Sequence, residues 1–186
     1  MLAYLLSICE KKYHPIIEHI YYTYQEDMVR FAKFRLRNRS IPNYEIEAED
    51  VVQNSFIKIV TYAYRIKAKS KPQVLKSYVM QIVKNESRTF VKNFFKTPEV
   101  ETLEEEFGSI EDYDATLNIL GIYEDVIDII DDLDEIYSNP LYLKFIMDFE
   151  VCEIALIMEI SEKTIYTRLG RGRKMLMDKL KERVYE

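Results

Sequence analysis

The chain of 186 residues is long enough for one ordinary domain or two small ones, and its 48% of hydrophobic residues excludes a globally disordered protein. It contains four Gly and five Pro and has no alternating pattern flanked by hairpin turns, so an all-helical fold is predicted. The net charge of −6 argues against indiscriminate binding to nucleic acid, and no apolar segment is long enough to insert into a membrane.

Three amphipathic helices are predicted in the first half of the chain. The first runs over about 15–38, the second begins near Glu47, and the third covers about 73–95 after a basic loop at 65–71. Basic and aromatic residues are interleaved on the third helix, which suits single-stranded nucleic acid, although aromatics at this spacing also suit a core. The candidate contacts on this helix are Lys76, Tyr78, Gln81, Lys84, Asn85 and Arg88.

An acidic linker is predicted at 97–120, between helical domains at 1–96 and 121–186. Residues 1–96 carry a net charge of +8, residues 97–160 carry −18, and residues 161–186 carry +4. This asymmetry predicts two cationic surfaces joined by an anionic middle.

The second domain is expected to begin with a helix at 122–136, and Ser138 and Pro140 are expected to start another that ends near Asp148. A short apolar helix at 151–158, a turn and a longer basic helix then form a helix-turn-helix pattern, whose second helix enters the major groove of DNA. An ordinary helical hairpin with a solvated basic face is the alternative.

Ser161 suits the N-cap of the last helix, and Gly172 fills a gap in an apolar stripe that includes Ile165 and Leu176. The turn before this helix commonly has Gly where this chain has Glu159, and a left-handed conformation at that residue costs about 1 kcal/mol. The candidate DNA contacts on the last helix are Lys163, Thr164, Tyr166, Thr167, Arg168, Arg171 and Lys174.

No catalytic or metal-binding constellation is found, so we expect neither an enzyme nor a cofactor. There is no glycine-rich phosphate loop and no nucleophile with a plausible His base. Cys9 and Cys152 lack metal-ligand spacing, and His14 and His19 have no Cys partners, which predicts free thiols in a cytoplasmic protein.

Two motifs occur in one order along the chain: AEDVVQNSF at 48–56 followed by SYVMQIVKNESRTFVKN at 77–93, and then FEVCEIALIMEISEKTIYTRLGRGRKML at 149–176. The first motif is similar to region 2, and the second to region 4, of the extracytoplasmic-function (ECF) family of bacterial RNA polymerase sigma factors. The resemblance implies a two-domain all-α protein that binds the β′ and β subunits of RNA polymerase core and confers promoter recognition and strand opening. An anti-sigma protein is a further partner that the family suggests.

The resemblance also distributes roles among the residues. The polymerase contacts would be Glu49, Asp50, Gln53, Asn54 and Phe56 on the second helix. The third helix would capture the melted minus-ten element, with Asn85 at the family's usual Asn and Tyr78 where Trp is common. The last helix would read the minus-thirty-five element.

Three residues depart from the family pattern: Glu150 replaces a Ser cap, Glu159 replaces the turn Gly, and Gly170 lies where a side chain is usual. Two other functions remain open. A stand-alone helix-turn-helix regulator would account for the C-terminal domain but not for AEDVVQNSF or the basic third helix. A sigma mimic that only binds an anti-sigma protein would be expected to have lost its DNA-facing basic residues, which this chain retains.

Overall fold

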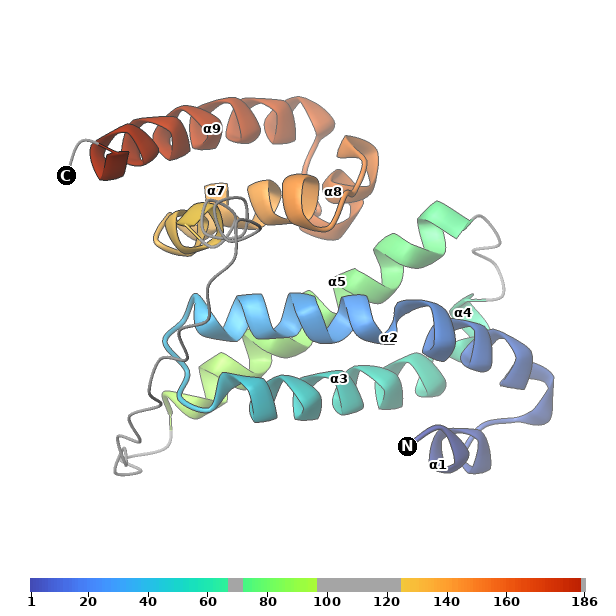
Figure 1. Ribbon diagram of the computed structural model, residues 1–186. Helices are drawn as coiled ribbons and strands as arrows, with labels where there is room; N and C mark the ends of the chain where they lie inside the picture. Colours follow the sequence, from blue (N-terminus) through green and yellow to red (C-terminus); the bar gives the residue numbers. More distant parts are fainter. Residues whose placement is uncertain (67–71, 97–124, 185–186) are drawn as a thin grey trace, which may run out of the picture.

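The structure, a computed structural model, describes residues 1–66, 72–96 and 125–184. These residues form helices and turns and contain no strand, which confirms the predicted all-α fold (Figure 1). The predicted linker at 97–120 and positions 67–71 of the predicted basic loop lie outside the described residues. The first two positions of that loop, Arg65 and Ile66, belong instead to a short helix.

The N-terminal unit is built on three long helices, α2 (His14–Arg37), α3 (Tyr44–Thr61) and α5 (Pro72–Phe94). The short elements α1 (Leu2–Ser7), η1 (Lys11–Tyr13) and α4 (Ala63–Ile66) complete it. The three long helices pack around fully buried apolar side chains that include Phe31, Phe56 and Met80. Asn43 adopts a left-handed conformation with φ of 52°, and α3 begins directly after it, three residues before the predicted start at Glu47.

The C-terminal unit contains a helical stretch at 125–131, α7 (Glu135–Leu141), the π-helical turn η2 (Tyr142–Ile146), α8 (Val151–Met158) and α9 (Glu162–Val184). The single helix predicted at 122–136 is wrong. The first stretch ends at Asp131, and Asp134 caps a new helix, because its carboxylate accepts a hydrogen bond of 2.9 Å from Ile136 N. The predicted restart at Pro140 is also wrong, since this proline lies inside α7, where its missing N–H removes one helical hydrogen bond.

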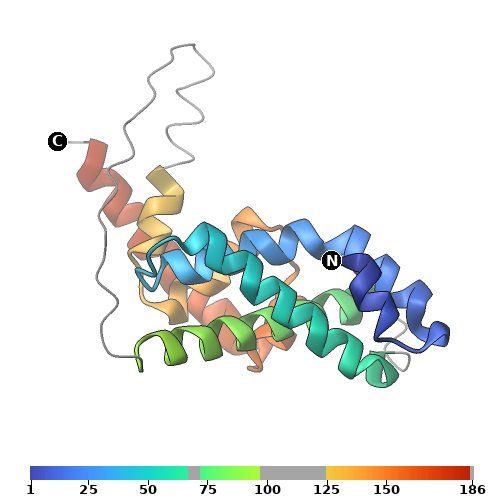
Figure 2. The ribbon, with the colours of Figure 1, turned by 90° about the horizontal axis from the view of Figure 1, so that it is seen from below.

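The two units are packed against each other, with α7 and α8 lying over α2 and α5 and α9 packed on the other side of α7 and α8 (Figures 1 and 2). One apolar cluster runs through both units, and Phe149 and Ile157 of the C-terminal unit are fully buried in it. Phe34 at the end of α2 stacks on Tyr142 of η2, with ring centroids 3.7 Å apart. The cationic surfaces of the N-terminal unit are therefore held close to the acidic segment 125–159.

Candidate nucleic-acid interface

A helix-turn-helix is formed by α8, a tight turn and α9. Glu150 precedes α8 and forms a capping box with Glu153, in which the Glu150 side chain stands in place of the usual Ser and the Glu150 backbone N–H donates to the Glu153 carboxylate over 2.9 Å. Glu159 has φ of 60° and ψ of 39°, the left-handed conformation expected for this turn despite the absence of Gly. Ser161 caps the N-terminus of α9 as predicted, since its Oγ accepts a hydrogen bond of 3.2 Å from Thr164 N.

Packing of α9 fixes which of its faces is available. Ile165 is fully buried and Leu176 nearly so, as the apolar stripe predicted. A Cβ atom added to Gly172 would lie 2.9 Å from Leu141 Cδ1 and 3.3 Å from Tyr137 Cβ, so this glycine permits the close approach of α7. The opposite side of α9 is thereby turned away from the core.

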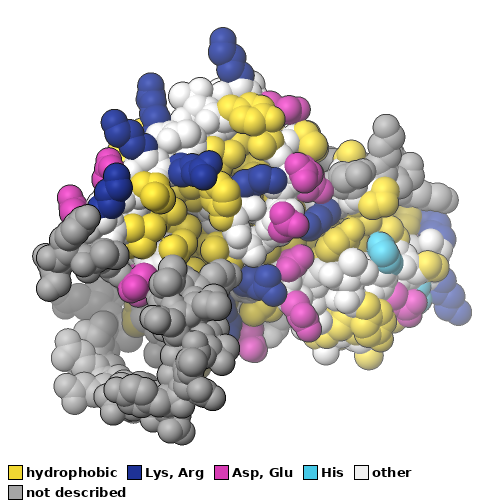
Figure 3. All heavy atoms as spheres, turned by 45° about the horizontal axis from the view of Figure 1, so that its top comes forward, with side chains coloured by type: hydrophobic (Ala, Val, Ile, Leu, Met, Phe, Trp, Pro, Cys, Tyr) yellow, Lys and Arg dark blue, Asp and Glu magenta, His cyan; other side chains and the backbone are white. Residues whose placement is uncertain are grey.

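Most of the candidate contacts on α9 are on this outward side. Arg168 and Thr164 are half-buried, and the other five are exposed: Lys163, Tyr166, Thr167, Arg171 and Lys174. Five of the seven line a groove of about 420 Å³ between α9 and α7. In the view from the α9 side, Lys and Arg side chains project along the upper edge of the molecule (Figure 3). This surface offers cationic and hydroxyl donors to a duplex.

The candidate contacts on α5 are in a different situation, because several already have partners in the C-terminal unit. The ammonium of Lys76 lies 3.8 Å from the centroid of the Phe149 ring, a cation–π contact. Gln81 Nε2 donates to Glu159 Oε1 over 2.7 Å, and Lys84 Nζ donates to Glu159 Oε2 over 2.9 Å. Lys84 also donates to the backbone carbonyl of Ile157 over 2.7 Å, and its side chain is only 14% exposed.

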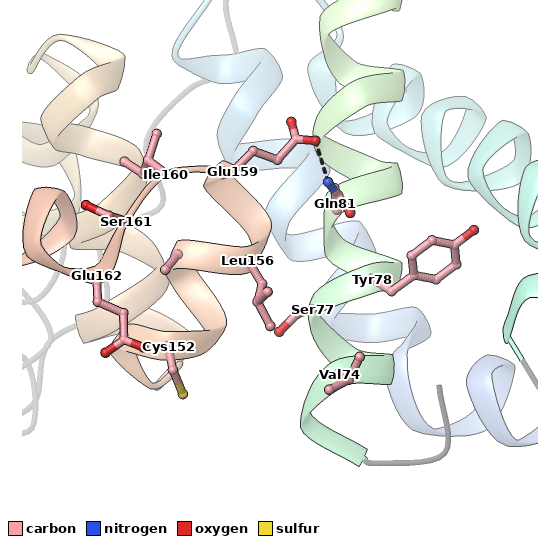
Figure 4. Close-up of a pocket in the computed structure, with 11 residues that line it drawn as sticks. Val74, Ser77, Tyr78, Gln81, Cys152, Leu156, Glu159, Ile160, Ser161 and Glu162 are labelled. Atoms are coloured by element: carbon pink, nitrogen blue, oxygen red, sulfur yellow. Dashed lines mark hydrogen bonds between the residues drawn. The ribbon is translucent and has the colours of Figure 1, made fainter. Parts of the chain in front are cut away.

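The remaining contacts of this set are more open. Asn85 and Arg88 are exposed. Tyr78 is half-buried and lines a cleft of about 760 Å³ between α5 and the α8–α9 turn (Figure 4). The cleft is also lined by Leu156, which is 52% exposed although it is apolar.

Four of the five predicted polymerase contacts form an exposed polar patch on the second and third turns of α3: Glu49, Asp50, Gln53 and Asn54. The fifth, Phe56, does not belong to that surface. Its side chain has no exposed area and its ring packs 5.3 Å from that of Tyr21, so it positions α3 rather than meeting a partner. Ile46 and Ile57 on the same helix are also exposed, although they are apolar. The sequence did not identify them as surface residues, because the apolar pattern alone assigns such residues to a core.

A second set of polar contacts, between α7 and the end of α2 with the two residues after it, was not foreseen in the sequence. Arg35 donates to Asn139 over 3.1 Å, Asn38 donates to Ser138 over 3.2 Å, and Arg39 donates to Glu135 over 2.8 Å. The charge asymmetry indicated that the basic and acidic segments could attract each other, but long-range pairs at a separation of about 100 residues carry no local sequence signal.

The electrostatics of these contacts depend on how deeply each group is buried. Hydrogen bonding and attraction from Lys84 lower the pKa of Glu159, which keeps it ionised near neutral pH. Burial raises the pKa of Asp131 to about 6 even though Arg37 pairs with it. Burial likewise lowers the pKa of Arg35, which is only 7% exposed. Lys84 and Glu159 therefore form a favourable pair, whereas burial of the charged forms of Asp131 and Arg35 at the contact between the units is unfavourable.

Among the described residues, no group of three or more His, Cys, Asp or Glu side chains could hold a metal ion. The described helices also include none that is both long and apolar enough to cross a membrane.

Residues 123–176 match the family model described as Sigma-70, region 4. The matched range includes α7, α8, the turn and the first two thirds of α9, and thus all seven candidate DNA contacts on that helix. No curated protein matches the chain. The match supports a DNA-binding role in transcription initiation, as in a sigma-70 family factor, and it concerns a domain class that is not enzymatic. It does not distinguish one subgroup of sigma factors from another.

Proposed function

We propose that this protein is a sigma factor of the extracytoplasmic-function type, which binds bacterial RNA polymerase core and directs promoter recognition and strand opening. The observation that carries the proposal is the exposed cationic face of α9 within the range matched to Sigma-70, region 4. The protein supplies specificity and has no catalytic step of its own.

The upstream promoter element is read by α9 in the major groove. Arg168 and Arg171 are placed to donate to base edges, and Lys163 and Lys174 to contact phosphates that fix the register. Gly170 is exposed and has no neighbouring atom within 4 Å of where its Cβ would lie, so at this point the DNA backbone can approach the helix closely.

The downstream element is captured by α5 as an unpaired strand. Arg88 and Lys84 would contact the backbone phosphates, while Asn85 and Tyr78 would contact or stack on bases taken out of the duplex. Trapping unpaired bases favours the open complex because the melted strand is bound and the closed duplex is not.

Core polymerase is contacted by the exposed polar patch on α3, and we assign its docking site to the β′ subunit with further contacts to β. Glu49, Asp50, Gln53 and Asn54 are exposed on consecutive turns, which gives a partner direct access to their side chains. The protein would act in the cytoplasm, and an anti-sigma protein would compete for these same surfaces.

Reconstitution with core polymerase tests the proposal. The purified chain is mixed with core enzyme and fragmented genomic DNA, and the transcripts are sequenced from their 5′ ends. A sigma factor yields start sites that share two upstream elements and that depend on the added chain. Random start sites would contradict the proposal and favour an interaction module.

A stand-alone helix-turn-helix regulator is the second candidate, because the α9 face is exposed in the closed chain and could reach duplex DNA without polymerase. It predicts specific duplex binding by the free chain that core polymerase leaves unchanged, whereas a sigma factor gains promoter affinity when core is added.

A further inference from the structure

The two proposed nucleic-acid faces differ in accessibility when the chain is closed. On α9, five of the seven candidate contacts are exposed. On α5, Lys76, Gln81 and Lys84 already contact the C-terminal unit through the Phe149 ring, the Glu159 carboxylate and the Ile157 carbonyl. We call the six candidate contacts on α5 the strand-capture face. In the closed chain, the DNA-binding face of α9 is therefore accessible, whereas half of the strand-capture face is covered.

The Glu159 contact has the chemistry of an anion site. Its two carboxylate oxygens take one hydrogen bond from the Gln81 amide and one from the Lys84 ammonium, and the dashed line in Figure 4 marks the first of these. A phosphate oxygen pair of a nucleic-acid strand would use the same two donors. Glu159 and the strand are consequently mutually exclusive ligands of these side chains.

Resting on the function proposed above, we propose that Glu159 is an intramolecular latch that occupies the strand-capture face of α5 and keeps the free chain closed. The carboxylate belongs to Glu159, which has, in the turn between α8 and α9, a left-handed conformation that favours Gly. Its position at the tip of the helix-turn-helix places it 75 residues along the chain from Lys84 and yet within 2.9 Å of it. Separation of the two units removes the latch and uncovers the strand-capture face.

The closed arrangement is built to be reversible. Arg35 Nε is buried without a hydrogen-bond partner among the described residues, and Asp131 Oδ1 is in the same state. Buried polar atoms of this kind regain water when the units separate, which offsets part of the contact that is lost. The cleft of about 760 Å³ beside Tyr78 and Leu156 also leaves the contact between α5 and α8 incompletely packed.

Substitution of Glu159 in the full-length chain tests the latch. Glu159→Gly removes the carboxylate and suits the left-handed turn, and Glu159→Asn removes it while retaining a side chain that tolerates this conformation. Glu162→Gln is the matched control, since it makes the same change of charge three residues away on the rim of the same cleft. All variants are compared by circular dichroism to confirm that the helices are retained.

Two measurements on the free chain are made. The distance between the units is followed by spin labels at Thr61→Cys on α3 and Asp178→Cys on α9, with Cys9 and Cys152 replaced by Ser. Binding of a fluorescent single-stranded oligonucleotide of about 20 nucleotides and mixed sequence is followed by anisotropy at low salt. We expect Glu159→Gly and Glu159→Asn to lengthen the label distance and to raise strand affinity about five- to tenfold, and Glu162→Gln to change it less than about twofold.

A Lys84→Gln background shows whether the gain arises at the latch. There, adding Glu159→Gly should raise strand affinity less than about twofold, because the ammonium for which Glu159 and the strand compete is gone. An unchanged label distance in Glu159→Gly, or equal gains with and without Lys84, would overturn the latch. If the free chain opens as expected but gives no start-site specificity with core polymerase, the latch stands and the proposed function falls. If core polymerase initiates at specific sites but the Glu159 substitutions have no effect on the free chain, the proposed function stands and the latch falls.

Discussion

The two glycines of α9 provide a paired test of how this helix is positioned. Gly170→Ala adds a methyl group at an exposed site with no atom within 4 Å, so only the higher helix propensity of Ala counts, which stabilises the folded chain by about 1 kcal/mol. Gly172→Ala gains the same propensity but places its Cβ 2.9 Å from Leu141 Cδ1, 3.2 Å from Leu141 Cγ and 3.3 Å from Tyr137 Cβ. Leu141 is fully buried, so its side chain has little room to move, and overpacking of this kind costs about 1–3 kcal/mol.

The free energy of unfolding should therefore rise in one variant and fall, or at best stay level, in the other. Urea denaturation followed by circular dichroism measures both values, and a difference of about 1–3 kcal/mol corresponds to at least about 2 °C between the melting temperatures. The clash is identified by a third variant: in a Leu141→Ala background, Gly172→Ala should stabilise the chain as Gly170→Ala does. Equal stabilisation by the two single glycine variants would refute the claim that Gly172 sets the distance between α7 and α9.

The other predictions concern the three faces and one buried carboxylate. Reversing Glu49 and Asp50 to Lys should abolish association with core polymerase in a pull-down while leaving the circular dichroism spectrum unchanged, and undiminished binding would contradict the assignment of the α3 patch. Arg171→Ala should weaken binding of the holoenzyme to the upstream element by about 1–3 kcal/mol, whereas a loss equal on random duplex would indicate a phosphate contact. Asn85→Ala should leave duplex binding near normal but reduce permanganate reactivity of thymines near the start site, and a pre-melted template should rescue it. Because burial raises the pKa of Asp131 to about 6, the folded chain binds more protons than the unfolded chain between pH 7 and 5 and should gain about 1 kcal/mol of unfolding free energy over that range. Asp131→Asn should remove this gain, and an unaltered pH profile would show that the carboxyl is not buried.

The elements that the sequence predicted well have local signals. The apolar stripe of α9, the Ser161 cap and the left-handed turn at Glu159 depend on spacing and on the chemistry of single residues, and each has the expected form. The predicted helix at 122–136 is wrong because helical periodicity alone treats Asp134 as one more polar residue on a helical surface. Its capping hydrogen bond to Ile136 competes with helix continuation, and periodicity alone does not register that competition.

The contacts between the units could not be predicted in the same way. Arg35 meets Asn139, and Lys84 meets Glu159, through packing of two units that are distant in sequence. Phe56 illustrates an error of a different kind. The resemblance implied a contact between Phe56 and the polymerase, whereas the structure places this side chain fully buried in the core.

The departure at Glu159 has different meanings in isolation and in the folded chain. Within the helix-turn-helix alone, a non-Gly residue in a left-handed conformation costs about 1 kcal/mol and has no compensation. Against α5, the same residue supplies the carboxylate that Lys84 and Gln81 require, because Lys84 is largely buried and needs an anion beside it. The local cost is then paid in every state, while the compensation exists only when the units are closed. A chain with this arrangement favours closure more than one with Gly at the turn, and any partner that separates the units must offset the loss of the contact between Lys84 and Glu159.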